Sequence, residues 1–404
     1  MNLLGLLLFG IIFSFVLFGY VKPDVVFPHA TYVYLKDGRI PMSKRATYFP
    51  FLLSAVGVFL VLSGFQYINT AEFTRSGFDG TWSNDMSRYW FGFQDAGSLP
   101  FRLFLLSQGQ EPLYLVFIYV MRKLTVHFSF VLLVAYAFFA VSVIQFLKDF
   151  VLFRSGVQRQ SFLAAVLSFF VIFYIFILVS FCLFRMGLAV AISMHTCRFL
   201  LKGKWKGAYF ASLVACGFHF SAMILFPVCI MYRIYRSGKL KFSFFLFLFF
   251  AVFVLGLVFA KVVPQIMKLF SSRYLAYGNE EGVTVKMHFA NILFVLMVLY
   301  RRKDFFRTKQ DEVCFIILLS NFFVFDLQLI ISIFYRMLMF SYPCSMILIP
   351  RLFQIYKIRR NDMIVPLLAR LFLAIYLLYS LYIFCFYNWI SYGLSSSYKL
   401  FYFY

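Results

Sequence analysis

Two arginines lie inside apolar stretches of the chain, where a charged side chain is unexpected. Arg185 and Arg336 each follow an aromatic residue, and no carboxylate lies within several residues of either. A guanidinium stays protonated in any protein environment, and placing one in hydrocarbon costs about 2.5 to 3.5 kcal/mol on insertion scales. Such an arginine usually faces a bundle interior or a polar cavity with an anionic partner. An anionic ligand is therefore our first hypothesis, and snorkelling to the membrane interface from helix ends is the alternative.

Acidic and aromatic residues that could handle a sugar hydroxyl lie in the segment 77–89. Asp85 and Tyr89 are four residues apart, so they share one face if the segment is helical. A carboxylate at a closed cleft can act as a general base toward a hydroxyl. Asp79 and Arg88 stand close by and are candidates for substrate binding together with Tyr89. The alternative is a solvated loop in which Asp85 only caps a helix.

Two further groups of residues could meet substrate or carry a proton. Glu111 directly precedes Pro112 at the start of an apolar segment that contains Tyr114. We expect Glu111 and Tyr114 to contact substrate, with simple helix initiation as the alternative, because a helix N-terminus favours both proline and negative charge. His219 lies deep in another apolar segment. It is a candidate catalytic residue, and a neutral histidine bonded to backbone is the alternative.

Charge and aromatic faces also occur together near residue 275 and beside Arg336. Arg273, Tyr274 and Tyr277 are suited to phosphate and sugar rings, although anchoring at a membrane interface would use the same residues. Tyr335 is a further candidate for substrate binding because it adjoins Arg336.

The composition indicates an integral membrane protein. Of the 404 residues, 63% are hydrophobic and only 13% are charged, and the chain holds 60 Phe and 27 Tyr. Stretches such as 162–182 and 242–260 are long enough to cross about 30 Å of hydrocarbon as helices, and helices satisfy their own backbone hydrogen bonds there. The predicted fold class is all-α, a polytopic transmembrane helical bundle.

The placement of the charges predicts the topology. The net charge is +23, but the basic residues lie in short loops between apolar runs, which is a membrane topology signal and argues against nucleic acid as a partner. Six basic segments should face the cytoplasm: 22–45, 148–159, 202–206, 233–241, 301–309 and 351–360. The segment from Glu72 to Glu111 holds five acids and three arginines, so we expect it on the opposite side.

About 10–12 membrane segments follow from this scheme. The clearest spans are 3–20, 48–66, 126–147, 160–181, 186–201, 242–263, 287–300, 313–333, 337–350 and 364–388. Residues 100–121 are better interpreted as an interfacial or re-entrant helix. Residues 207–231 form either one span or a hairpin of two half-length helices that turns near residues 216–219, and we favour the hairpin because basic residues flank both ends.

Two sizeable external loops, about 67–111 and 264–286, would form a lid and an acceptor surface. No domain boundary or repeat is apparent, so residues 1–404 are predicted to form a single integral membrane domain.

The seven cysteines lie in or beside apolar runs without zinc-binding spacing. Dinucleotide, Walker, zinc-protease and DxD motifs are missing too. We therefore expect no cofactor, no metal and no nucleotide donor.

The sequence resembles the EpsG/Wzy group of bacterial exopolysaccharide and O-antigen polymerases over nearly its whole length. The resemblance depends on short motifs and their order: Asp85 with Tyr89, Glu111-Pro112-Leu113-Tyr114, Arg185 to Ala189, Phe218 to Ser221, Arg336 to Phe340, and Ile347 to Pro350. Both Asp79 and Asp85 are available as the acid of the first motif.

The resemblance implies a glycosyltransferase that joins polyprenyl-pyrophosphate-linked oligosaccharide repeat units at the external face of the bacterial inner membrane. Arg185 and Arg336 would stabilise the leaving pyrophosphate, and Asp85, or else His219 or Glu111, would accept a proton. The expected partners are the lipid-linked oligosaccharide and the bilayer, and a chain-length regulator is a partner that the sequence leaves open. The alternatives are a flippase or transporter of lipid-linked oligosaccharide, and a lipid-linked monosaccharide transferase.

Overall fold

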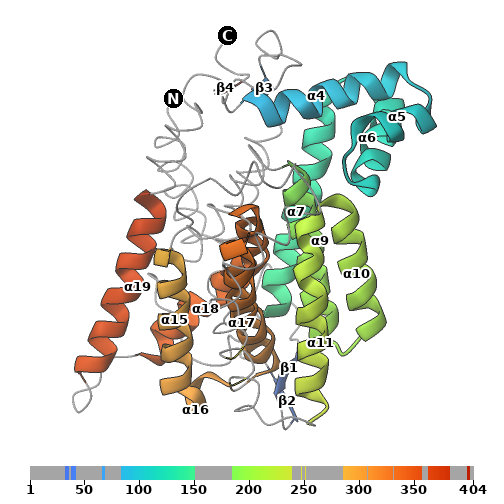
Figure 1. Ribbon diagram of the computed structural model, residues 1–404. Coiled ribbons are helices and arrows are strands. Elements are labelled where there is room, and N and C mark those ends of the chain that lie inside the picture. The colour runs from blue at the N-terminus through green and yellow to red at the C-terminus, as the bar shows by residue number, and fades with distance from the viewer. Residues whose placement is uncertain are drawn as a thin grey trace. The chain divides into compact units, whose positions relative to one another are not determined.

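Helices dominate the computed structural model of the chain (Figure 1). The structure describes residues 32–35, 38–41, 66–68, 83–150, 184–238, 247, 251, 285–306, 308–330, 332–356, 363–382 and 398–400. The chain divides into two compact units. Unit 1 comprises Met1–Met194, Val214–Phe220 and Leu377–Tyr404, and unit 2 comprises His195–Leu213 and Ser221–Tyr376. The prediction of a mainly helical chain is confirmed, whereas the predicted single membrane domain stays a prediction.

Among the residues that the structure describes, unit 1 contains four consecutive helices and parts of three more. They are α4 (Ser83–Ser98), α5 (Phe101–Gln108), α6 (Pro112–Leu124), α7 (Phe128–Phe150), the beginning of α9 (Phe184–Leu201), the end of α10 (Trp205–Phe218) and the end of α19 (Ile364–Tyr382). Phe93, Phe104, Ile118 and Val131 are at most 1% exposed and form part of one core. Burying a side chain of this size contributes about 1.5 to 3 kcal/mol, so packing between the helices holds the unit together.

The segment 100–121 is not the single helix that the sequence predicted, because α5 ends at Gln108 and α6 begins at Pro112. Gly109 has a φ of 54°, a left-handed conformation that glycine adopts without steric penalty. Pro112 then occupies the first turn of α6, where its missing N–H is not needed. The break places Glu111 at a helix entrance and away from the middle of a helix.

The four strands of the described residues are short. β1 (Tyr32–Leu35) pairs antiparallel with β2 (Gly38–Pro41), and β3 (Gln66–Ile68) pairs antiparallel with β4 (Tyr398–Leu400). The second pairing joins Gln66 to Leu400, which brings two distant parts of the chain together within unit 1.

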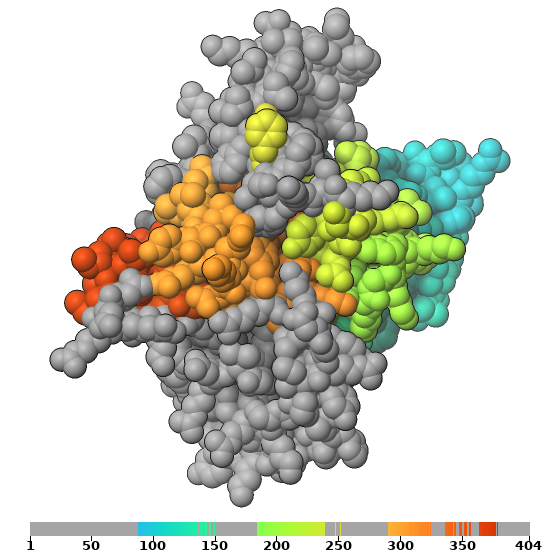
Figure 2. Space-filling model, turned by 90° about the horizontal axis from the view of Figure 1, so that it is seen from below, coloured from blue at the N-terminus to red at the C-terminus, as the bar shows by residue number. Residues whose placement is uncertain are grey.

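In unit 2, α17 (Lys309–Ile330) packs against several neighbours. These are α11 (Leu225–Arg236), α15 (Val285–Tyr300), η4 (Ser332–Ser341) and α18 (Tyr342–Ile355). The short α16 (Arg302–Phe305) follows α15, and α19 (Ile364–Tyr382) is the last helix that the structure describes. Phe294 of α15 lies against Phe372 and Tyr376 of α19, with ring centroids 5.4 and 4.9 Å apart. Figure 2 shows the orange and red surfaces of these parts adjoining.

The favoured hairpin interpretation of residues 207–231 is confirmed. α10 ends at Phe218, a short 3-10 turn η3 (Phe220–Ile224) follows, and α11 leads back. Trp205 packs on Tyr232, with ring centroids 5.8 Å apart, and Ser212 Oγ lies 3.7 Å from Cys229 Sγ. The second contact lies closer to the turn than the first on both helices, so α10 and α11 run antiparallel.

Several other predicted spans coincide with helices. The segments 126–147, 186–201, 287–300 and 364–388 correspond to α7, α9, α15 and α19, and 313–333 corresponds to α17. Residues 337–350 begin inside η4 and continue into α18. The predicted spans 3–20, 48–66, 160–181 and 242–263 lie almost entirely outside the described residues.

Among the helices that the structure describes, none combines the length and the apolar character required to cross a membrane.

Candidate functional site

Glu111 is the N-cap residue of α6, but its side chain does not cap that helix. No side-chain capping hydrogen bond forms there. The carboxylate instead makes an ion pair with Arg185 through Oε2 and Nη1. Both side chains are 17% exposed, so the pair is largely shielded from water. The alternative in which Glu111 only initiates a helix therefore does not account for its side chain.

The guanidinium of Arg185 lies between two tyrosine rings. Its Cζ atom is 5.6 Å from the ring centroid of Tyr89 and 5.7 Å from that of Tyr114. The two rings are themselves 5.8 Å apart, edge to face. The face of an aromatic ring attracts a cation, and two rings at this distance restrict where the guanidinium can move.

Phe184, which directly precedes Arg185, joins the same aromatic group. Its ring centroid lies 5.7 Å from that of Tyr89 and 6.1 Å from that of Tyr114. All three aromatic side chains are at most 3% exposed. The tyrosines therefore support Arg185 from the protein interior and have little exposed surface, and the substrate contact that the sequence suggested for Tyr89 and Tyr114 stays a prediction.

The break after α10 supplies a second donor to Glu111. The backbone N–H of Phe220 donates to Oε1 at 3.2 Å. Because η3 starts at this residue, the N–H belongs to the first turn of a new helical segment, where backbone donors have no partner within the helix. His219, which is buried, lies close enough for its charge to act on Glu111.

These neighbours decide the ionisation of Glu111. Burial by itself would raise its pKa, but Arg185, His219 and the Phe220 N–H together outweigh burial and hold the pKa below the usual glutamate value. Glu111 is therefore ionised at neutral pH. A carboxylate with a lowered pKa is a weak proton acceptor, so these surroundings do not favour Glu111 as the general base.

One guanidinium donor of Arg185 remains unused within the described part of the chain. Its Nε is buried and has no hydrogen-bond partner there. A buried donor without an acceptor costs about 1 to 3 kcal/mol. An added oxygen ligand at this donor would remove that cost.

Asp85 and Arg88 belong to α4, as does Tyr89. The predicted helix is therefore present, and Asp85 precedes Tyr89 by about one helical turn. Arg88 is exposed. The Asp85 side chain lies outside what the structure describes, so its role as a base stays a prediction.

Arg336 belongs to unit 2, where η4 separates α17 from α18. A 3-10 segment of 10 residues is long for this type of helix. The Tyr335 side chain is not described, although its backbone is part of η4. Asp79, Arg273, Tyr274 and Tyr277 lie outside the described residues. The predicted joint action of Arg185 and Arg336 stays a prediction.

Five of the predicted site residues, from four separate segments of unit 1, are thus brought together: Tyr89, Glu111, Tyr114, Arg185 and His219.

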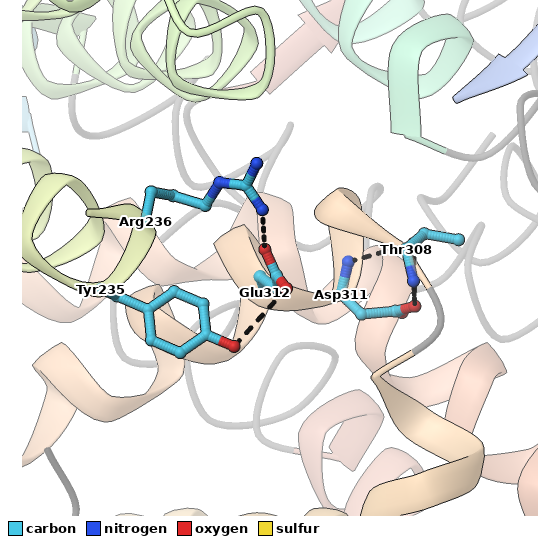
Figure 3. A network of polar contacts seen from close by, with 5 residues as sticks. All are labelled: Tyr235, Arg236, Thr308, Asp311 and Glu312. Atoms are coloured by element: carbon cyan, nitrogen blue, oxygen red, sulfur yellow. Dashed lines mark hydrogen bonds and ion pairs between the residues drawn. The ribbon is translucent and has the colours of Figure 1, made fainter. Parts of the chain in front are cut away.

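Sequence reasoning missed a second polar network, in unit 2 (Figure 3). Glu312, only 1% exposed, accepts hydrogen bonds from Arg236 Nη1 at 3.3 Å and from Tyr235 Oη at 3.4 Å. Burial, and then the charge of Glu312, raise the pKa of Tyr235 to about 12. The network fixes the end of α11 against the beginning of α17.

Thr308 and Asp311 form a reciprocal cap beside this network. The Thr308 N–H donates to Asp311 Oδ2 at 3.0 Å, and the Asp311 N–H donates to Thr308 Oγ1 at 3.3 Å. The T-x-x-D spacing is a helix-start signal that a search of the sequence could have found. Within the part of the chain that the structure describes, no group of three or more His, Cys, Asp or Glu side chains could hold a metal ion.

The structure thus defines a mainly helical protein with a largely buried arginine held by a carboxylate and aromatic rings, a type of site suited to an anionic group. The chain belongs to the EpsG family, whose sequence profile matches residues 51–394. This is the exopolysaccharide and O-antigen polymerase family. Comparison with curated proteins and with solved structures gave no match.

Proposed function

We propose that the chain is a polysaccharide polymerase that joins polyprenyl-pyrophosphate-linked oligosaccharide repeat units at the external face of the bacterial inner membrane. Membership of the EpsG family supports a polymerase role in general. The single observation that carries the more specific proposal is Arg185, which is mostly buried, ion-paired and flanked by aromatic rings, with one donor still unmatched.

The chemistry of such a transfer calls for a cation at the leaving group. The bond between the anomeric carbon of the donor glycan and a pyrophosphate oxygen breaks, and an acceptor hydroxyl forms the new glycosidic bond. Polyprenyl pyrophosphate departs with the bonding electron pair, while the hydroxyl proton passes to a base. A guanidinium that is already in place when this charge develops lowers the barrier.

Within this proposal, Arg185 and Arg336 bind the pyrophosphate, and Asp85 or His219 accepts the proton. Arg273, Tyr274 and Tyr277 belong to the surface that receives the acceptor. No nucleotide donor or metal takes part.

A multi-pass position in the bilayer is part of the proposal. Ile364, Leu368, Leu371 and Ile375 of α19 are 54% to 72% exposed. Their spacing of three and four residues places them on one side of the helix. Acyl chains would cover such a surface without loss of any polar contact.

The test is incubation of the purified protein in lipid nanodiscs with one defined lipid-linked repeat unit, followed by sizing of the products. A ladder of multiples of the repeat unit is expected. Addition of a single sugar would indicate the monosaccharide transferase instead, and movement of unaltered substrate across the bilayer would indicate a flippase. Arg185→Ala should lower kcat about 10²- to 10³-fold, by analogy with the loss of one oxyanion donor.

A further inference from the structure

Both oxygens of the Glu111 carboxylate are engaged inside the protein. Oε2 bonds Arg185 Nη1, and Oε1 accepts the backbone N–H of Phe220 at 3.2 Å. The carboxylate is thereby fixed between the start of α9 and the break after α10. A substrate that contacted Glu111 would have to compete with these two partners.

We propose that Glu111 is a positioning residue, which orients the Arg185 guanidinium toward the pyrophosphate of the lipid-linked substrate without touching the substrate itself. This inference rests on the proposed function. The ion pair uses Nη1 of Arg185, and the buried Nε has no partner within the described part of the chain, so Nε remains for an oxygen atom of the leaving group.

The aromatic rings and the carboxylate restrict Arg185 in complementary ways. Tyr89 and Tyr114 lie 5.6 and 5.7 Å from the guanidinium carbon and limit its displacement. A ring face attracts the cation without selecting one N–H direction. A hydrogen bond to a fixed carboxylate does select a direction, so Glu111, together with the Tyr89 hydroxyl, sets the rotation of the guanidinium plane.

The ionisation of Glu111 is consistent with this role. Burial opposes its charge, but Arg185, His219 and the Phe220 amide keep its pKa low. A permanent carboxylate can hold an arginine throughout a reaction cycle, whereas a general base must take up and release a proton.

The test is a double-mutant cycle in the polymerisation assay, with Glu111→Gln, Arg185→Ala and both together. Glu111→Gln keeps the shape of the side chain and removes its charge. We expect kcat to fall about 10- to 100-fold, because a displacement of 1 Å at a reacting group can cost about 10²-fold, while KM changes less. If Glu111 acts only through Arg185, the double variant will be no more than about twofold slower than Arg185→Ala alone.

The opposite pattern overturns the proposal. A double variant slower than Arg185→Ala by the full factor of Glu111→Gln would mean that Glu111 meets the substrate independently. Loss of the acidic limb of the pH–rate profile in Glu111→Gln would assign it as the base. An unchanged limb supports a positioning role.

Glu312→Gln is a matched control because it also breaks a glutamate–arginine pair, the one with Arg236 in unit 2. It should lower the melting temperature and leave kcat and KM unchanged. Should Glu111→Gln fail to fold, Glu111→Asp keeps the charge and withdraws the carboxylate by one methylene. The proposal is supported if Glu111→Asp lowers kcat in the otherwise wild-type protein but has no further effect on kcat in Arg185→Ala. It is overturned if Glu111→Asp leaves the kcat of the otherwise wild-type protein undiminished.

Different results would refute the proposed function of the chain and the positioning role of Glu111. Wild-type protein that forms no polymer, or Arg185→Ala with full activity, would refute the proposed function. Additive effects of Glu111→Gln and Arg185→Ala in an active polymerase would refute only the positioning role.

Discussion

Gly217 of α10 lies directly against Leu113 of α6. A methyl group added at Gly217 would stand 2.5 Å from both Cδ1 and Cγ of Leu113 and 3.0 Å from its Cβ. Rotation of the leucine side chain cannot relieve the contact with Cβ, so the close approach requires glycine. This contact lies between the two elements that hold Glu111: it is two residues after the carboxylate on α6 and three residues before the Phe220 N–H.

Gly217→Ala should push the end of α10 away from α6 and lengthen the bond between Phe220 and Glu111. We expect a loss of about 1 to 3 kcal/mol in the free energy of unfolding, as for other overpacked sites, together with a lower kcat. Thermal denaturation and the polymer ladder measure the two effects. Leu113→Ala in the same chain should restore part of both, and a double variant as impaired as Gly217→Ala would contradict this steric explanation.

The ion pair of Glu111 should make stability depend on acidity. The folded pKa is lowered, so the stabilisation by the charged form is fully present above the ordinary glutamate pKa of about 4.3. It is lost as the pH falls through the lower, folded pKa. Wild type should therefore melt at a higher temperature than Glu111→Gln near pH 7, and the two curves should converge in acid. A difference that persists unchanged at pH 3 would show that the charge is not the cause.

Arg185→Lys should restore little of the activity that Arg185→Ala loses. The ammonium group of lysine is a point charge, and it cannot bond one oxygen of Glu111 and also present a planar fork to a phosphate. The expected product is single repeat units in both variants, with normal amounts of protein in the membrane. Polymer of normal length in Arg185→Lys would argue against a geometric role for the guanidinium.

Arg336→Ala should also abolish polymer while single-repeat products and membrane insertion remain. The expectation follows from its position in η4 amid apolar sequence, where a charged side chain is costly to bury and usually faces an anionic group. Analysis of product length in cells and quantification of the protein in membranes provide the measurement. Normal polymer with this variant would leave Arg185 as the remaining candidate for pyrophosphate binding.

The Arg236–Glu312 pair should contribute to folding without a part in catalysis. Removal of Arg236 leaves a carboxylate that is 1% exposed with Tyr235 as a remaining donor. Arg236 is itself 34% exposed, so water weakens the pair, and we expect Arg236→Ala to lose about 1 to 3 kcal/mol of stability. Chemical denaturation of the purified protein would measure this, and an unaltered unfolding midpoint would be the contrary result.

The sequence by itself identified Arg185 and Glu111 as candidate site residues. Arg185 stood out because a guanidinium in apolar sequence requires an explanation, and Glu111 because an acid precedes a proline at a helix start. The break near His219 followed from basic residues on both sides of an apolar segment, and the structure confirms it. These conclusions depend on local periodicity and on the cost of burying charge, which a sequence displays directly.

Only the tertiary structure decided that Glu111 is the partner of Arg185. The two residues are 74 positions apart, and local pattern carries no information about which helix ends meet after packing. The sequence suggested an external anion for Arg185 and substrate contact for Glu111, Tyr89 and Tyr114. The fold buries both tyrosines and satisfies the carboxylate from two segments, because close packing of α6, α9 and α10 fixes distances that no spacing along the chain can specify.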